Sequence, residues 1–362
     1  MNENQAGAVL TVRCGAVAEN WKKLKQIVGK TDCAAVLKAD GYGLGLQKMA
    51  EVLKNAGCRT FFVAYDFEGA QVRQVCPDAR IFVLHGVFDG CEENFVHDRL
   101  IPVLATPQAV AHWRAFALKT GKTLPCAVHI DTGMSRLGLT GDEVKALKPA
   151  DFDGLDVVLV MSHLARADEP DGADMSRRQL EKFKEETALL QSVVGKPFER
   201  SLSASYGIYL GPEYHFDVVR PGHALYGLME NLTPVLELKV RILQVQKAKA
   251  FQPVGYGSTD CLQKDGKLAT ISIGYADGYA RSFSGDGVGF INGKPARVVG
   301  RVSMDLTTLD VSDFSDEELR DAKFVELIGE HADAATQAKL AKTIDYELLV
   351  HLGKRIFFRY VD

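Results

Sequence analysis

The feature that most constrains the fold is a regular alternation of short apolar segments and amphipathic helices over the first two-thirds of the chain. The apolar segments lie at residues 33–39, 60–65, 80–86, 100–106, 125–133, 155–165, 198–205 and 216–222. A long amphipathic helix is predicted at residues 176–193, between the segments 155–165 and 198–205. Short apolar strands that alternate with helices indicate a parallel sheet covered by helices. About eight repeats fit a closed (β/α)8 barrel of the TIM type better than an open sheet.

The pattern changes near Pro234. Residues 235–248 form a long, partly alternating segment, and Asn292-Gly293 between two β-rich runs predicts a type I′ hairpin. Only residues 336–353 have helical periodicity in this part. We therefore expect a barrel domain at residues 1–235 and a mostly β domain at residues 236–362. The first ten or so residues are expected to form a strand that packs with the second domain.

Composition excludes several classes of function. Hydrophobic residues make up 46% of the 362 positions, which suffices for a large core. The formal charge is 43 − 47 = −4 with no basic block, so we expect no nucleic-acid or membrane partner. The N-terminal residues do not resemble a signal peptide, and no apolar run is long enough to span a bilayer. Seven scattered cysteines without a CxxC pair predict free thiols, a cytoplasmic protein and no metal site.

Polar residues follow the predicted strands, where the catalytic groups of barrels lie. Lys38 comes directly after the apolar run AVL and before a loop with three glycines, ADGYGLG. A single lysine is usually a surface residue, but partial burial here would lower its pKa and allow a Schiff base. Five more polar side chains end other strands: Arg136, His163, Ser203, Ser205 and Arg220.

The segment VRPGHALYG at 218–226 favours a phosphate site. Gly222 precedes a predicted helical turn, so the N–H groups of Gly222 and His223 could bind a phosphate together with Ser205. The alternative is a simple Pro-Gly turn. The chain has no GxxxxGK[ST] motif and no GxGxxG after the first strand, which disfavours ATP and NAD. A Schiff-base lysine with a phosphate site points to pyridoxal 5′-phosphate (PLP).

Six segments together resemble the alanine racemase family. They are, in chain order, LKADGYGLG, HIDTGMSRLG, VRPGHALYG, IGYADGY, GRVSMD and RIFFRY, and the resemblance runs from Val9 to Tyr360. It implies an N-terminal barrel, a C-terminal β domain and PLP as cofactor. It also implies a head-to-tail homodimer with two shared active sites. The reaction would interconvert L- and D-alanine through an external aldimine, for peptidoglycan synthesis or for alanine catabolism.

The resemblance also implies roles in cofactor binding. Lys38 would carry the cofactor covalently, Arg220 would face the pyridine nitrogen, and His163 would lie beside it. The phosphate would be held by Tyr42, Ser205, the backbone of Gly222 and His223, and Tyr360.

Further roles concern the substrate. Arg136 would lie near the phenolic oxygen of the cofactor and the substrate carboxylate. Racemisation needs two bases on opposite faces of the α-carbon, and the family implies Lys38 and Tyr275 of the partner subunit. Met304 and Asp305 of the partner subunit would lie beside that tyrosine.

Three positions depart from the commonest pattern of the family. Leu44 stands where many members have histidine, and Ala204 where many have asparagine. His129 replaces a lysine that is often carbamylated and braces the arginine equivalent to Arg136. Beside Arg136 we expect a neutral His129 with a lowered pKa. A small anion, most simply chloride, should then brace the arginine.

Other functions on the same architecture remain open from the sequence. A racemase for serine or lysine would use the same residues. A PLP-dependent amino-acid decarboxylase would carry glutamate in place of Arg220, and a cofactor-storage protein would lack the β domain.

Overall fold

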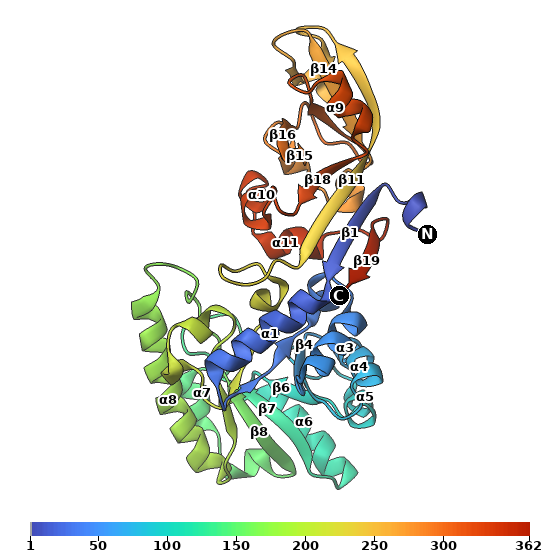
Figure 1. Cartoon of the computed structure of the whole chain (residues 1–362). Coiled ribbons are helices and arrows are strands. Elements are labelled where there is room, and N and C mark those ends of the chain that lie inside the picture. The colour runs from blue at the N-terminus through green and yellow to red at the C-terminus, as the bar shows by residue number, and fades with distance from the viewer. Residues whose placement is uncertain (1) are drawn as a thin grey trace. The chain divides into compact units, whose positions relative to one another are not determined.

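The computed structural model describes residues 2–362, and the chain divides into two compact units. One unit contains Val17–Gly41 and Gly45–Leu225 and holds the parallel strands. The other contains the residues up to Ala16, Tyr42–Leu44 and Tyr226–Asp362 and is mostly β-sheet. Figure 1 shows the elements of each unit along the chain.

The first unit is a closed parallel barrel, as the alternating pattern predicts. Seven strands pair in sequence order: β3 (Ala35–Val36), β4 (Thr60–Val63), β5 (Arg80–Val83), β6 (Ile101–Leu104), β7 (Leu124–His129), β8 (Leu155–Met161) and β9 (Glu199–Ser201). The ring closes through β10 (Val218–Val219), which pairs in parallel with β2 (Asp32–Cys33) on one side. On its other side, a parallel bridge joins Arg220 to Ala204. Because β2 continues into β3 after one residue, the described chain forms an eight-stranded barrel.

Helices follow most of these strands and cover them (Figure 1). They are α1 (Cys14–Val28), α3 (Leu46–Ala56), α4 (Asp66–Val75), α5 (Glu92–His97), α6 (Pro107–Thr120), α7 (Gly141–Ala146) and α8 (Ala173–Val194). After β9 and β10 the chain forms only short 3-10 turns, η3 (Tyr206–Tyr209), η4 (Pro212–Tyr214) and η5 (His223–Tyr226). The strands read as continuous apolar runs because both of their faces are buried. Phe62 and Phe82, for example, are fully buried and stack at 4.7 Å.

The second unit is built on one large sheet. Its strands lie in the order β16 (Lys294–Arg297), β15 (Val288–Ile291), β18 (Phe324–Ile328), β11 (Leu236–Ala248), β1 (Ala8–Arg13) and β19 (Phe357–Val361). Beyond this path, β14 (Gly266–Ile271) pairs with β11 and with β17 (Thr307–Asp310). The first strand of the chain therefore belongs to this sheet, between β11 and β19.

Local signals in the second unit are partly confirmed. Asn292 and Gly293 connect β15 to β16 with φ values of +50° and +78°, as a type I′ turn requires. The single helical region expected at 336–353 is wrong in detail. The structure has α10 (Ala334–Leu340) and α11 (Asp345–Val350), because the chain turns at Lys342, where φ is +58°. A further helix, α9 (Asp316–Asp321), was not expected; Ser315 and Glu318 form its capping box.

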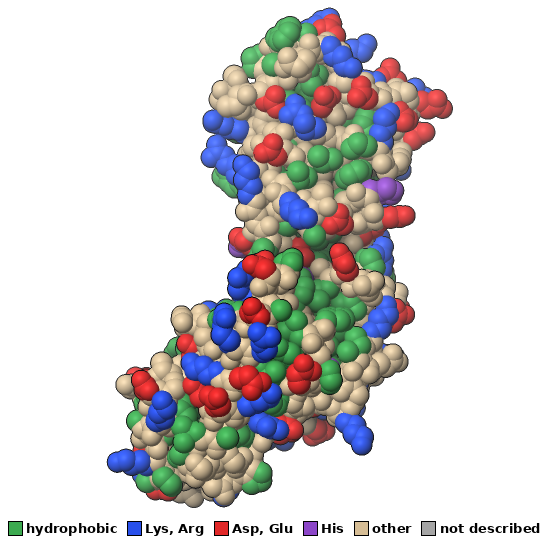
Figure 2. Space-filling view, turned by 90° about the vertical axis from the view of Figure 1, so that its left-hand side faces the viewer, with side chains coloured by type: hydrophobic (Ala, Val, Ile, Leu, Met, Phe, Trp, Pro, Cys, Tyr) green, Lys and Arg blue, Asp and Glu red, His purple; other side chains and the backbone are tan. Residues whose placement is uncertain are grey.

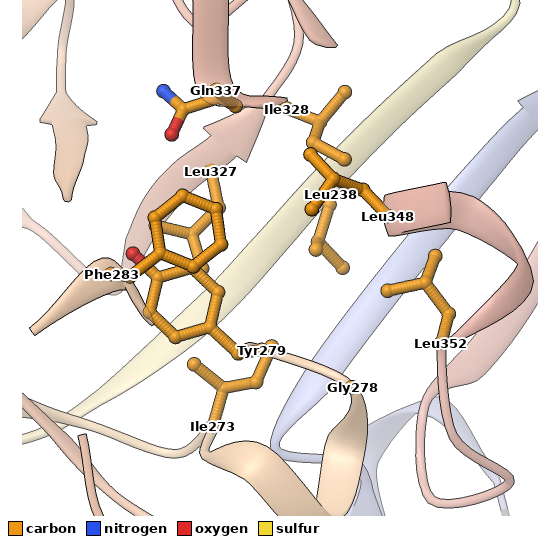
Figure 3. A pocket seen from close by; sticks show the side chains of 10 residues that line it. All are labelled: Leu238, Ile273, Gly278, Tyr279, Phe283, Leu327, Ile328, Gln337, Leu348 and Leu352. Atoms are coloured by element: carbon orange, nitrogen blue, oxygen red, sulfur yellow. The ribbon is translucent and has the colours of Figure 1, made fainter. Parts of the chain in front are cut away.

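An apolar pocket lies among the buried side chains of the second unit. Figure 3 shows the rings of Tyr279 and Phe283 face to face on one side of it, and they stack at 4.3 Å. Leu238, Leu348 and Leu352 close another side. None of the site residues predicted from the sequence lines this pocket.

The surface carries charges of both signs. On the face shown in Figure 2, basic and acidic side chains are interspersed and no large single-sign patch forms. Within residues 2–362, no helix is both long and apolar enough to cross a membrane.

Candidate active site

Lys38 lies at the carboxyl end of the first barrel strand, in an unusual turn. It begins α2 (Lys38–Tyr42), in which Ala39, Asp40 and Gly41 all have left-handed backbone angles. Water reaches the side chain, yet its amine makes no hydrogen bond or ion pair with any residue of the described chain. Desolvation by the surrounding barrel and the charge of Arg136 lower the pKa of this amine, and Glu68 opposes them. A lowered pKa increases the fraction of the unprotonated amine that attacks a carbonyl.

Arg220 is buried at the end of β10, with an exposed fraction of 3%. Its Nη1 donates to Ser201 Oγ at 2.5 Å, and its Nη2 donates to the carbonyl of Ser162 at 2.6 Å. Its Nε makes no hydrogen bond to any described residue and so keeps a free donor. Burial lowers the guanidinium pKa to about 9, which leaves it cationic at neutral pH.

Two histidines lie beside this arginine and are held neutral. Burial and the charge of Arg220 lower the pKa of His163 to about 3 and that of His129 to about 4. Arg136 lowers both pKa values further. Nδ1 of His163 lies 3.5 Å from Arg220 Nη2, so this nitrogen faces a donor and the ring N–H belongs on Nε2. The expected neutral form of His129 agrees with its environment.

The predicted phosphate site is centred on Ser205. Its Oγ accepts hydrogen bonds from the N–H groups of Gly222 and Ala224, both at 3.1 Å. The Gly222 N–H is thus engaged by the serine, and the hydroxyl proton remains to be donated to an anion. His223 begins the 3-10 turn η5, and its ring stacks on Tyr206 at 5.5 Å.

Ser203, which the sequence groups with the strand-end residues, has another contact. It is fully buried, and its hydroxyl donates to the carbonyl of Tyr214 at 2.8 Å. The serine whose side chain binds the Arg220 guanidinium is Ser201, two residues earlier, whereas Ser203 accepts the Arg220 backbone N–H with its carbonyl.

Tyr42 and Tyr360 belong to the mostly β unit. Tyr42 packs against Tyr226 at 4.9 Å, and burial raises the pKa of its hydroxyl. Tyr360, on β19, donates from its hydroxyl to the carbonyl of Leu44 at 3.0 Å.

Tyr275, Met304 and Asp305 lie together on the surface of the mostly β unit. Tyr275 and Met304 are 46% and 53% exposed. The N–H groups of Tyr275 and Ala276 donate to the carbonyls of Ser303 and Met304, both at 3.0 Å. Arg355 then joins the two loops, because its Nε donates to Asp277 and its Nη1 to Asp305.

Sequence reasoning missed the polar groups behind the site. Gln179 on α8 is fully buried and bonds to Thr132, to the carbonyl of His163 and to the N–H of Ala165. Glu68 on α4 is buried and accepts the N–H of Ala39, next to Lys38. A buried polar residue within an apolar helical stripe was the available signal for Gln179.

These donors fit a phosphorylated aldehyde such as PLP. Lys38 offers an unpaired amine with a lowered pKa, Arg220 offers a free Nε–H, and Ser205 offers a hydroxyl beside backbone amides. Since these groups come from the ends of β3, β9 and β10, one end of the barrel holds them all. This combination defines a barrel-type enzyme that works with an aldehyde cofactor.

Comparison with known proteins identifies the family. The model of the alanine racemase N-terminal domain matches residues 12–230, and that of the C-terminal domain matches residues 235–360. A biosynthetic alanine racemase of Agrobacterium fabrum is 43% identical and covers 99% of this chain and 94% of its own. A catabolic alanine racemase of Mesorhizobium japonicum is 39% identical, and the match covers 100% of this chain and 95% of that protein. The chain belongs to the alanine racemase family.

A solved structure agrees with this assignment. The alanine racemase of Bartonella henselae, crystallised with covalently bound pyridoxal phosphate, has a TM-score of 0.93 and 36% identity. The match covers 98% of this chain and 100% of that one.

Proposed function

We propose that this chain is a PLP-dependent alanine racemase that interconverts L- and D-alanine. The observation that carries the proposal is Lys38, an amine with no partner in the described chain and a lowered pKa. When bound, PLP supplies an electron sink that makes the α-proton of an attached amino acid removable.

Cofactor binding is assigned to residues at the barrel end. Lys38 Nζ would bind the aldehyde carbon, and the phosphate would be held by Ser205, Gly222, His223, Tyr42 and Tyr360. Arg220 would face the pyridine nitrogen with its free Nε–H, and His163 would lie beside it. A guanidinium can donate but does not give up its proton, so Arg220 would leave that nitrogen unprotonated and would keep the electron sink weak. A weak sink favours return of the proton over competing reactions.

Two bases move the α-proton. Nζ of Lys38 takes the proton of D-alanine, and the hydroxyl oxygen of Tyr275 of the partner subunit takes that of L-alanine. Arg136 orients the substrate carboxylate. Tyr360, Tyr275 of the partner subunit and the partner's Met304 crowd the entrance, which limits the substrate side chain to a small group, and the partner's Asp305 lies beside that tyrosine. This assignment requires a homodimer with shared sites.

We also propose a role for each domain, a cellular compartment and two possible biological roles. We assign residues 1–235, apart from the N-terminal strand β1 that belongs to the second sheet, to the cofactor-binding barrel, and 236–362 to the domain that supplies the second base. All seven cysteines are free thiols, which supports a cytoplasmic enzyme. The similarity to both a biosynthetic and a catabolic alanine racemase leaves supply of D-alanine for peptidoglycan and alanine breakdown as the two roles.

The direct test measures racemisation of both alanine enantiomers by the purified protein. Borohydride reduction followed by peptide mapping should place the cofactor on Lys38. L-serine and L-lysine, assayed in parallel for racemisation and for release of carbon dioxide, separate the related activities. If the protein racemised serine or lysine faster than alanine, or released carbon dioxide from its substrate, that activity would replace alanine racemisation as the assigned function.

A further inference from the structure

The backbone directly after Lys38 is strained. Ala39 has φ 55° and ψ 53°, and Asp40 has φ 55° and ψ 46°. A non-glycine residue is disfavoured in this left-handed region, because its Cβ comes too close to the backbone carbonyl. Such a conformation persists only where surrounding bonds determine it. The bonds that hold this turn therefore also fix the direction in which Lys38 leaves the strand.

Most of these bonds are local, and one is not. The Gly41 N–H donates to the carbonyl of Leu37 at 2.8 Å, and the Leu46 N–H donates to Asp40 Oδ1 at 2.8 Å. The Ala39 N–H instead donates to Glu68 Oε1 at 2.7 Å. Glu68 lies in the first turn of α4, after the next strand of the barrel, so this bond ties two neighbouring strand ends together.

Glu68 does more than cap its own helix. It is 5% exposed, and its Oε2 accepts the N–H groups of Ala64 at 2.7 Å and Tyr65 at 3.2 Å. Glu143, at the equivalent position of α7, bonds only to the N–H and hydroxyl of Thr140 in its own capping box. Glu68 forms no ion pair with any residue of the described chain. Its buried charge is therefore available to the nearby amine.

The charged and titratable groups around Lys38 come from three other elements. Arg136 follows β7, His163 follows β8, and Glu68 lies on α4. Burial and Arg136 lower the amine pKa, and Glu68 raises it. His163 is neutral near pH 7 and adds no charge.

We propose that Glu68 is the positioning residue for Lys38. Its carboxylate fixes the peptide that follows the lysine and supplies the negative charge that keeps the amine able to hold a proton. The inference deepens the proposed function, because Lys38 must both accept and return a proton during racemisation.

The test compares Glu68→Gln with Glu143→Gln. Both substitutions remove a charge from a helix capping box, but Glu143 makes no bond to a second loop. Full-length protein freed of cofactor is acylated over a pH series, and modification of Lys38 is followed by peptide mass spectrometry. Glu68→Gln should move the Lys38 titration to lower pH, whereas Glu143→Gln should leave it at the wild-type position. In the reconstituted enzyme, Glu68→Gln should slow alanine racemisation on the order of 100-fold, as misplacement of a reacting group does.

Two results would overturn the inference: a Lys38 titration in Glu68→Gln equal to wild type, or an equal shift in Glu143→Gln. If Glu68→Gln does not fold, Glu68→Asp keeps the charge but is one methylene too short to bridge both loops. In Glu68→Asp, Lys38 should titrate as in wild type and alanine racemisation should be slow. A wild-type rate of racemisation in this variant would contradict the positioning role. The labelling needs neither cofactor nor substrate, so a wild-type protein inactive on alanine would refute the proposed function alone.

Discussion

Replacing Gln179 by leucine should destabilise the barrel end that carries His163. Gln179 Nε2 donates to Thr132 Oγ1 at 3.1 Å and to the carbonyl of His163 at 2.8 Å. Its Oε1 accepts the N–H of Ala165 at 2.8 Å. Leucine has nearly the volume of glutamine but can make none of these bonds.

The cost follows from the groups left behind. Thr132 keeps a partner, because its hydroxyl also bonds to Ser162 Oγ at 2.8 Å. The carbonyl of His163 and the N–H of Ala165 lose theirs. A buried polar group without a partner costs about 1–3 kcal/mol. Since both residues are only half-buried, we expect a loss of about 2–4 kcal/mol in the free energy of unfolding.

The assay is urea and thermal unfolding of the full chain, with Gln191→Leu as control. Gln191 lies on the same helix, and its side chain bonds to the carbonyl of Lys196 near the helix end. Gln179→Leu should lower the melting temperature by roughly 3–5 °C, and the control should change it much less. Equal unfolding of the two variants would refute the buried network as a source of stability.

Three further predictions concern the proposed bases and His129. Lys38→Ala should abolish racemisation and the visible absorbance of covalently bound cofactor; a reducible adduct in that variant would place the anchor on another lysine. Tyr275→Phe should slow α-hydrogen exchange more for L-alanine than for D-alanine, and mixed dimers of Lys38→Ala and Tyr275→Phe subunits should regain activity. Equal losses for the two enantiomers, or no recovery after subunit exchange, would contradict the shared two-base site. His129 has a folded pKa of about 4, so the unfolded chain binds more protons between pH 4 and 6.5, and stability should fall as pH decreases through that window. His129→Asn should reduce this dependence but not remove it, because His163 has a lowered pKa too. Wild-type activity should depend on chloride and not on bicarbonate; unchanged activity in a large non-coordinating anion would exclude the chloride.

The barrel was predictable because its signal repeats. Each buried parallel strand is a short apolar run, and each helix has one apolar stripe, so eight weak signals support one another. The second unit depends on long-range antiparallel pairing, and its short helices have weak periodicity. The helix α9 was detectable only from its capping box, Ser315 and Glu318.

Side-chain assignments within the site show where sequence reasoning stops. Ser201, Ser203 and Ser205 alternate along one segment and would share one face of a continuous strand. The strand β9 ends at Ser201, and the three hydroxyls then take different partners: Arg220, the carbonyl of Tyr214, and the amides of Gly222 and Ala224. Alternation predicts a face only while the strand continues. The bond from Ala39 to Glu68 and the bonds of Gln179 were missed because they join distant segments that no local pattern marks.

The charges at the barrel end indicate what this site is built to receive. Arg136 and Arg220 are cationic, and Lys38 adds a third positive charge when protonated. Burial and these charges hold His129 and His163 in their neutral forms, so neither histidine adds charge or acts as an acid near pH 7. The carboxylate of Glu68 offsets one positive charge in part. A phosphate dianion at Ser205 and a substrate carboxylate at Arg136 would supply the remaining negative charge. Ligand binding should therefore raise the pKa of Lys38, so that the lysine becomes a stronger base once the cofactor and substrate are in place.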